Sequence, residues 1–173
     1  MKGATIDRVL FAVLALLFAG FLYTVRNSFE QRIVDKGDTA PAFEVTTDNG
    51  KRISTKDFGG KLLVLNFWAT WCPPCIQEMP SLDQFAQEMA KEGVVVLGVS
   101  VDKNEQVYKQ FLQRARLAFE TSRDPEANIS ADYGSFKWPE TYVINGKGKV
   151  VAKFIGDRNW TDPKMVASIK AML

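Results

Sequence analysis

The chain has 173 residues, of which two are cysteine and none is histidine, so its length suits one folded domain with an appendage. Hydrophobic residues make up 46% of the chain, which is enough to build a core and excludes wholesale disorder. The missing histidine excludes Ser-His-Asp and Cys-His catalysis, His-bearing zinc sites and His-ligated haem. Two cysteines allow one disulfide, one reactive dithiol or two unconnected thiols.

The formal net charge of +2 comes entirely from residues 1–36, because acidic and basic side chains balance over 37–173. A domain that binds nucleic acid normally carries an excess of Lys and Arg, clustered on one face. The balanced charge of 37–173 therefore predicts that nucleic acid is not a partner.

An uncharged run of seventeen residues, 9–25, lies between Arg8 and Arg26. A helix of this length just spans a thin hydrocarbon core, and flanking arginines can reach the headgroups. We expect a transmembrane signal anchor here, with a short cytoplasmic tail (1–8) before it and a linker (26–37) after it. A cleaved signal peptide and a buried core helix are the alternatives, but no small-residue cleavage triplet follows the run, and it has no polar face. The domain would then lie outside the cytoplasm, where cysteines oxidise.

Apolar patterning from residue 38 to 173 predicts one α/β domain. Predominantly apolar runs at 62–68 and 94–101 are typical of strands buried on both faces, and the amphipathic helix between them makes a parallel, right-handed βαβ unit. A closing hairpin makes the sheet mixed. The remaining expected strands cover 43–46, 52–54, 117–121, 141–145 and 150–155, and the expected helices cover 74–91, 104–116, a short stretch within 124–134 and a last one ending at 172.

The second of these helices is expected to begin after a cap at Asp102 or Asn104. Its apolar side chains, Val107, Phe111 and Leu112, are expected to face the core.

The two cysteines, Cys72 and Cys75, enclose two prolines where a buried strand passes into a helix. Cys72 at the helix N-terminus is expected to be exposed, and the free amides and helix dipole there favour its thiolate. Cys75 lies one turn inside the helix and is expected to be shielded. This arrangement suits thiol–disulfide exchange, in which Cys72 attacks a substrate disulfide and Cys75 resolves the mixed disulfide.

The prolines bear on the direction of electron flow. Pro74 has no N–H to offer the thiolate, so the dithiol is less stabilised and the pair is expected to be a reductant. A structural disulfide is the alternative, although a four-residue ring adds little loop-closure stability. A zinc site is a further alternative, but it needs four ligands and the chain supplies two cysteines.

The run Asn66-Phe-Trp-Ala-Thr-Trp-Cys-Pro-Pro-Cys75 resembles membrane-anchored thioredoxin-like proteins of the ResA/TlpA/CcmG (DsbE) group. The resemblance extends over 38–173 and implies a thioredoxin-like fold. In that fold a mixed central sheet is flanked by helices, with an added N-terminal β-hairpin and an insert before the closing hairpin. It also implies that Pro139 is a cis-proline opposite the dithiol, receiving the substrate backbone. Candidate substrate-binding residues beside it are Trp71, Pro73 and Trp138, although Trp138 could equally belong to the core.

Two carboxylates are candidates for proton transfer near the cysteines. Glu140 follows Pro139 as in the Pro-Glu-Thr of the CcmG branch, although a solvated strand end would explain it too. Glu78 shares a helix face with Cys75, but an exposed helix charge is the alternative. Thioredoxins carry a buried aspartate where this chain has Asn66, and an amide cannot accept the resolving thiol's proton. A glutamate or water must do so instead.

These observations predict an extracytoplasmic thiol–disulfide oxidoreductase without a cofactor, acting mainly as a reductant at the bacterial cytoplasmic membrane. The resemblance implies an oxidised cysteine pair in apocytochrome c or a similar envelope protein as substrate, and a membrane thiol donor of the CcdA/DsbD type. One alternative is a thiol peroxidase of the peroxiredoxin type, but Thr70 stands too close to Cys72 for that motif. The other is a copper-binding thioredoxin-like module, which generally adds a distal histidine.

Overall fold

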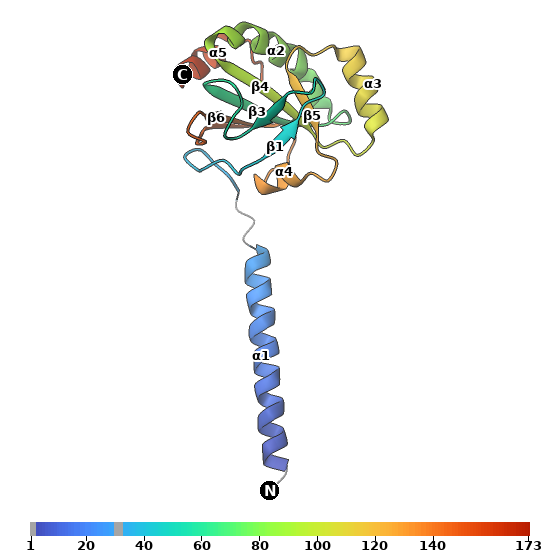
Figure 1. Ribbon diagram of the computed structural model, residues 1–173, viewed down its shortest axis with the longest axis vertical. Coiled ribbons are helices and arrows are strands. Elements are labelled where there is room, and N and C mark those ends of the chain that lie inside the picture. The colour runs from blue at the N-terminus through green and yellow to red at the C-terminus, as the bar shows by residue number, and fades with distance from the viewer. Residues whose placement is uncertain (1–2, 30–32) are drawn as a thin grey trace. The chain divides into compact units, whose positions relative to one another are not determined.

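The computed structural model describes residues 3–29 and 33–173, and these fall into two separate units (Figure 1). The first unit contains helix α1 (Gly3–Phe29), whose large apolar side chains between Leu10 and Tyr23 are exposed. Within the residues described, no helix is both long and apolar enough to cross a membrane. The span expected over 9–25 therefore stays a prediction, as do the tail and linker that flank it.

The second unit is built on a five-stranded sheet with the order β5-β4-β3-β6-β7. The three strands β3, β4 and β5 are parallel, β6 runs antiparallel to β3, and β7 runs antiparallel to β6. This confirms the thioredoxin-like mixed sheet and its βαβ unit. The strands are β3 (Leu62–Trp68), β4 (Val94–Ser100), β5 (Glu120–Arg123), β6 (Glu140–Asn145) and β7 (Val150–Ile155).

The expected N-terminal hairpin is present as β1 (Glu44–Thr46) and β2 (Arg52–Ser54). Its turn is joined to the rest of the unit through Asp48, whose carboxylate accepts hydrogen bonds from the Tyr108 hydroxyl at 2.5 Å and the Thr121 hydroxyl at 2.9 Å. The hairpin is thus fastened to the edge strand β5 and to the helix that carries Tyr108.

The helices are α2 (Pro73–Met89), α3 (Glu105–Ala115), α4 (Asn128–Asp132) and α5 (Pro163–Lys170), with a short 3₁₀ turn at Ala90–Glu92. The strand expected at 117–121 begins later, at Glu120. The expected inward face of α3 is wrong at Val107, which is 43% exposed, because Tyr108 takes the core position. The helix cap is Asn104, whose side chain accepts from the Val107 amide at 3.1 Å.

Successive side chains of β3 enter two different cores, because alternate residues of a strand point to opposite faces. Leu62 and Val64 pack with α2 and α5, whereas Leu63, Leu65 and Phe67 pack on the other face. In Figure 1, α2 and α5 lie on one side of the sheet, and the hairpin and α4 lie on the other. The two faces give neighbouring residues of the site different surroundings.

Candidate active site

The two cysteines are joined by a disulfide at the N-terminus of α2, with their Cα atoms 5.3 Å apart. Cys72 caps the helix, and its sulfur accepts from the Cys75 amide at 3.3 Å. Pro73 and Pro74 occupy the first two helical positions, where a missing N–H costs no helical hydrogen bond. Cys75 is fully buried, as expected, but Cys72 is only 5% exposed and not open to solvent, because it packs with Cys75 in the core cluster of that face.

The loop that leads into Cys72 is held by a residue with an unforeseen role, Asp102. Its carboxylate accepts from the Thr70 amide at 2.8 Å, from the Thr70 hydroxyl at 2.6 Å and from the Ser100 hydroxyl at 2.6 Å. Asp102 therefore fixes the active-site loop rather than capping α3. The sequence could have indicated this role, because Asp102 follows β4 and the carboxyl ends of neighbouring parallel strands meet at one edge of the sheet, which places Asp102 near the loop after β3.

Glu78 is 2% exposed, so the alternative of an exposed helix charge is wrong. Its carboxylate accepts from the Asn66 amide at 2.8 Å, from the Arg158 backbone N–H at 3.1 Å and from the Trp160 indole at 3.2 Å. Burial raises the pKa of Glu78 above its ordinary value, and the three hydrogen bonds only partly oppose this shift. Because residues three apart are neighbours on a helix, this carboxyl lies one turn beyond Cys75.

Asn66 extends this group of side chains toward the strand that follows the cis-proline. Its amide nitrogen donates both to Glu78 and to the Thr141 hydroxyl, at 2.9 Å, while its amide oxygen is buried without a hydrogen-bond partner in the described part of the chain. Asn66 and Thr141 are directly paired in the sheet and share the face that α2 covers. The amide nitrogen of Asn66 thus donates a hydrogen bond and cannot accept a proton. The carboxyl group at this place in the site belongs to Glu78.

Glu140 is also buried, at 3% exposed, so it is not a solvated strand end. Its carboxylate forms an ion pair with Lys153 at 2.8 Å and accepts from the hydroxyls of Tyr142 at 2.8 Å and Ser135 at 2.5 Å. Its partner across the sheet is Phe67, which faces away from α2. The structure thus brings Glu78, and not Glu140, to the face that carries Cys75.

Two of the predicted substrate-binding residues, Trp71 and Trp138, contact each other, and Trp71 is next to Cys72 in the chain. The bond between Trp138 and Pro139 is cis, as the resemblance implied. The rings of Trp71 and Trp138 meet edge to face with centroids 5.4 Å apart. Trp71 is 59% exposed. The partly buried Trp138 packs against both cores as well as against Trp71, so it belongs to the core and to the surface beside Trp71. Among the residues whose side chains the structure describes, no cluster of three or more is suited to hold a metal ion.

Comparisons with known proteins agree with this geometry. Residues 36–153 match the AhpC/TSA family, and the thiol-disulfide oxidoreductase ResA of Bacillus cereus is 35% identical over 157 residues, which cover 88% of this chain and 90% of that protein. The chain belongs to the AhpC/TSA family. The ResA relative is named a thiol-disulfide oxidoreductase, and the cysteine pair and thioredoxin-like fold of this chain make it a thiol-disulfide oxidoreductase as well.

Two further matches support this assignment within the AhpC/TSA family. The thioredoxin-like protein YneN of Bacillus subtilis is 35% identical over 150 residues, covering 83% of this chain and 87% of that protein. The crystal structure of a putative thiol:disulfide interchange protein DsbE from Chlorobium tepidum superimposes with a TM-score of 0.69 at 29% identity, covering 80% of this chain and 95% of that one. In both matches, similarity therefore covers four fifths or more of the chain.

Proposed function

We propose that this protein reduces disulfides in proteins outside the cytoplasm. The observation that carries the proposal is the Cys72–Cys75 pair at the start of α2, with the buried carboxyl of Glu78 one helical turn beyond Cys75. In the reduced protein the Cys72 thiolate attacks one sulfur of the substrate disulfide, and the other substrate sulfur leaves as a thiolate. The Cys75 thiolate then attacks the Cys72 sulfur. The substrate departs with both cysteines reduced, and the two electrons come from the Cys72/Cys75 dithiol.

Glu78 supplies the proton acceptor that this second step needs. A buried Cys75 thiol must lose its proton before it can attack, and a carboxylate whose pKa is raised by burial is a stronger base for that proton than an exposed carboxylate. When the disulfide is reduced again, the same carboxyl returns the proton. Glu140 lies on the other face of the sheet. Because it accepts a hydrogen bond from the Ser135 hydroxyl, we assign to it a structural role, which is to fix the segment from Ser135 to Pro139.

The prolines support the reducing direction. Of the first three amides after Cys72, only that of Cys75 exists to donate to the sulfur, at 3.3 Å. A thiolate with few donors is less stabilised, which makes the dithiol form the better electron donor. The expected reduction potential, measured against a dithiothreitol or glutathione buffer, lies well below the roughly −120 mV of a strong periplasmic oxidant. A value at or above that level would overturn the reductant assignment.

A matched variant checks the cause of the low potential. Pro74→Ala restores one N–H at the start of α2 and is expected to raise the potential of the pair. Pro80→Ala, made inside the same helix and more than a turn from the cysteines, is the control and is expected to leave the potential unchanged.

We further propose an oxidised cysteine pair in apocytochrome c or a similar envelope protein as substrate, with electrons from a membrane thiol donor of the CcdA/DsbD type. The resemblance of the Cys72–Cys75 region to the ResA/TlpA/CcmG group supports this. In a Cys75→Ala variant the mixed disulfide through Cys72 cannot be resolved, so the substrate is expected to stay attached and to be identified by mass spectrometry. Capture of the same proteins by Cys72→Ala would show that the nucleophile is misassigned.

The N-terminal segment is proposed to hold the domain at the outer side of the bacterial cytoplasmic membrane. Support comes from the uncharged run 9–25 and from the exposure of apolar side chains along α1, such as Phe11 at 76% and Leu16 at 74%. Tethering would raise the effective concentration of membrane-bound partners. The expected result is that the full chain stays with membranes after a carbonate wash and that deletion of 9–25 releases it. Release of the full chain by carbonate would contradict the anchor.

A further inference from the structure

Two asparagines of this chain are each followed by a glycine, at 49–50 and at 145–146, and a lysine follows each pair. Asparagine is a labile residue, because its side-chain amide can be lost as ammonia. The loss is easiest before glycine, which has no side chain to hinder the backbone nitrogen or to restrict its conformation. Both pairs lie in turns that connect antiparallel strands, β1 to β2 and β6 to β7. The sequence therefore treats the two pairs alike, whereas the structure holds them differently.

Asn145, at the end of β6, is fixed by hydrogen bonds. Its side-chain oxygen accepts from the backbone N–H groups of Lys147 at 3.0 Å and Lys149 at 3.1 Å, which holds the side-chain carbonyl in place. The backbone nitrogen of Gly146, the atom that would attack this carbonyl, donates to the Lys61 carbonyl at 3.1 Å. The two reacting groups can meet only if the turn opens and separates from the residue before β3.

Asn49, in the turn between β1 and β2, is exposed and loosely held. Its side chain has one hydrogen bond within the described part of the chain, from the amide nitrogen to the Glu120 carboxylate at 3.4 Å. Gly50 has a φ of +81°, and a carbon atom added to it would meet nothing within 4 Å. Its N–H donates only inside the turn, to the Thr47 carbonyl at 2.8 Å. The reacting groups can therefore meet through a movement confined to the turn.

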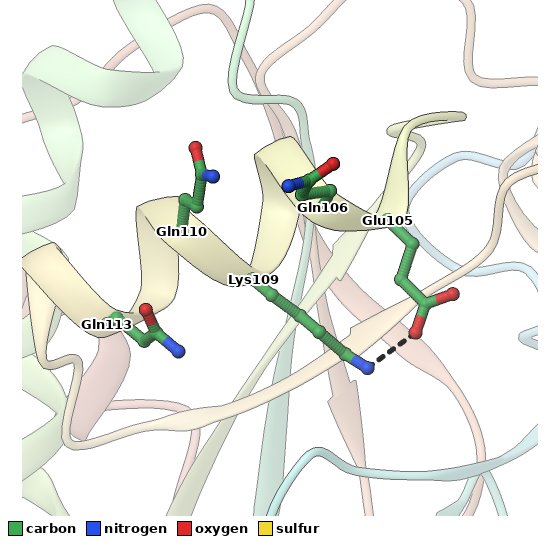
Figure 2. A pocket seen from close by; sticks show the side chains of 5 residues that line it. All are labelled: Glu105, Gln106, Lys109, Gln110 and Gln113. Carbon is green, nitrogen blue, oxygen red and sulfur yellow. Dashed lines mark ion pairs between the residues drawn. The ribbon is translucent and has the colours of Figure 1, made fainter.

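Exposure of a side-chain amide is not sufficient by itself. Figure 2 shows three glutamines on the outer side of α3, and all three are exposed: Gln106, Gln110 and Gln113. The backbone nitrogens that follow them lie within the helix, where the hydrogen bonds of the helix and its cap engage them. A glutamine would also have to close a larger ring. These amides are therefore expected to persist.

We propose that Asn49 is a site of spontaneous deamidation in the folded protein. The backbone nitrogen of Gly50 attacks the side-chain carbonyl carbon of Asn49 and gives up its proton as the new carbon–nitrogen bond forms, and the side-chain nitrogen leaves as ammonia. Water then opens the resulting cyclic succinimide at either of its carbonyls. The product is aspartate, or isoaspartate, in which the main chain runs through the former side chain. Nothing is oxidised or reduced, so the reaction is independent of the cysteines and of the function proposed above.

The conversion is expected to weaken the attachment of the hairpin. The new carboxylate stands opposite Glu120, so repulsion replaces the hydrogen bond between the two side chains. Isoaspartate also lengthens the main chain next to Asp48, whose carboxylate joins the hairpin to Tyr108 and Thr121. We therefore expect the converted protein to hold the segment 44–54 less firmly.

The test is incubation of the full chain, in detergent and mildly alkaline buffer, followed by digestion and mass spectrometry at intervals. In the folded protein the Asn49 peptide is expected to convert to the acid on the order of ten-fold faster than the Asn145 peptide, because conversion of the second requires local opening of its turn. The denatured chain is the matched control, in which both pairs are expected to convert at similar rates. Asn49→Gln is expected to abolish conversion at this position, and the peptide with the α3 glutamines is expected to keep its mass.

The remaining outcomes decide against the proposal or limit it. Equal rates at the two pairs in the folded protein, or faster conversion at Asn145, would overturn the site. The same holds if Asn49 converts in the denatured chain but stays intact in the folded one. Labelling by an isoaspartate-specific methyltransferase identifies the product, and hydrogen exchange of the converted protein tests the effect on the hairpin. Faster exchange in 44–54 with unchanged exchange in β3 is expected, and unchanged exchange in 44–54 would overturn the weakened attachment.

Discussion

Two buried glutamates, Glu78 and Glu140, lie on opposite faces of the same sheet and have different hydrogen-bond and charge partners. Glu140 has a cation, Lys153, at 2.8 Å. The hydrogen-bond donors to Glu78 are neutral: an amide, an indole and the backbone N–H of Arg158, whose guanidinium instead donates to backbone carbonyls of 155 and 157. Burial alone therefore does not distinguish the two carboxylates, whereas the cation beside Glu140 does.

The difference has opposite consequences for stability. An ion pair such as Glu140–Lys153 is a fixed structural unit whose disruption leaves a buried charge. Glu78, whose pKa is raised by burial, binds its proton more tightly in the folded than in the unfolded protein. Its contribution to the free energy of unfolding is therefore most favourable at low pH. That contribution is lost as the pH rises from the ordinary glutamate value through the raised one.

The largest expected effect tests the ion pair. Lys153→Met leaves the carboxylate of Glu140 buried without its cation and also removes the hydrogen bond to the Val34 carbonyl. The free energy of unfolding, measured by denaturant titration at pH 7, is expected to fall by about 4 kcal/mol.

The double variant Lys153→Met/Glu140→Gln is the control for that prediction, because it removes both charges together. It is expected to recover a substantial part of the lost stability. If it is no more stable than Lys153→Met, packing around Lys153 rather than the unpaired charge is responsible, and the contrast with Glu78 loses its electrostatic basis.

The second expected effect concerns proton transfer at Glu78. Glu78→Gln keeps the size of the side chain, and the unpartnered Asn66 oxygen can accept from the new amide once the Asn66 side chain turns over. The rate of resolution of the mixed disulfide at pH 7 is expected to fall about 100-fold, as for loss of a general base. Stopped-flow measurement over a range of pH is expected to show that the inflection due to Glu78 has disappeared.

Glu140→Gln is the matched comparison for this rate. It removes the other buried carboxylate and is expected to leave the pH dependence of the resolution step unchanged, whatever it does to stability. A shifted pH profile in Glu140→Gln together with an unshifted one in Glu78→Gln would reverse the roles of the two residues.

A smaller effect is expected when a second carboxyl is placed beside Glu78. In Asn66→Asp the donor to Glu78 becomes a second acid at hydrogen-bond distance, so the two groups share one proton. The variant is expected to lose about 2 kcal/mol of stability at pH 7 relative to pH 5, as two carboxylates this close resist joint ionisation. Denaturant midpoints at the two pH values measure it. Asn66→Ala, which removes the donor to Glu78 without adding a second acid, is the control and is expected to show a smaller pH-dependent loss.

The sequence predicted much of this molecule because its strongest signals are local. Two predominantly apolar runs specified β3 and β4, and the cysteines were placed at the strand-to-helix junction by neighbouring residues alone. The inward face of α3 was missed because apolarity favoured Val107, whereas the three- and four-residue spacing from Phe111 and Leu112 favours Tyr108, whose hydroxyl finds Asp48.

The surroundings of the two glutamates could not be predicted in the same way, because their partners are distant in the chain or depend on the sheet's orientation. The donors Arg158 and Trp160 come to Glu78 from about 80 residues further on. Every residue of β6 up to Ile144 is buried, so no alternation in the sequence shows that Glu140 faces away from α2. The three-residue spacing correctly placed Glu78 on the same face of α2 as Cys75, and the structure adds that this face of the helix is buried.

The smallest effect concerns the far end of the Glu78 group. Thr141→Val removes the hydroxyl that accepts from Asn66, so one donor of a buried amide loses a partner at almost unchanged side-chain volume. The expected cost is about 1 kcal/mol in a denaturant titration, and Thr141→Ser, which keeps the hydroxyl, is expected to recover most of it. The two variants also distinguish a structural role of Thr141 from a role in proton transfer. Thr141 holds Asn66 and not Glu78, so the pH profile of resolution should stay unchanged in Thr141→Val. A shift there would mean that the proton acceptor is the whole Thr141–Asn66–Glu78 chain and not the glutamate alone.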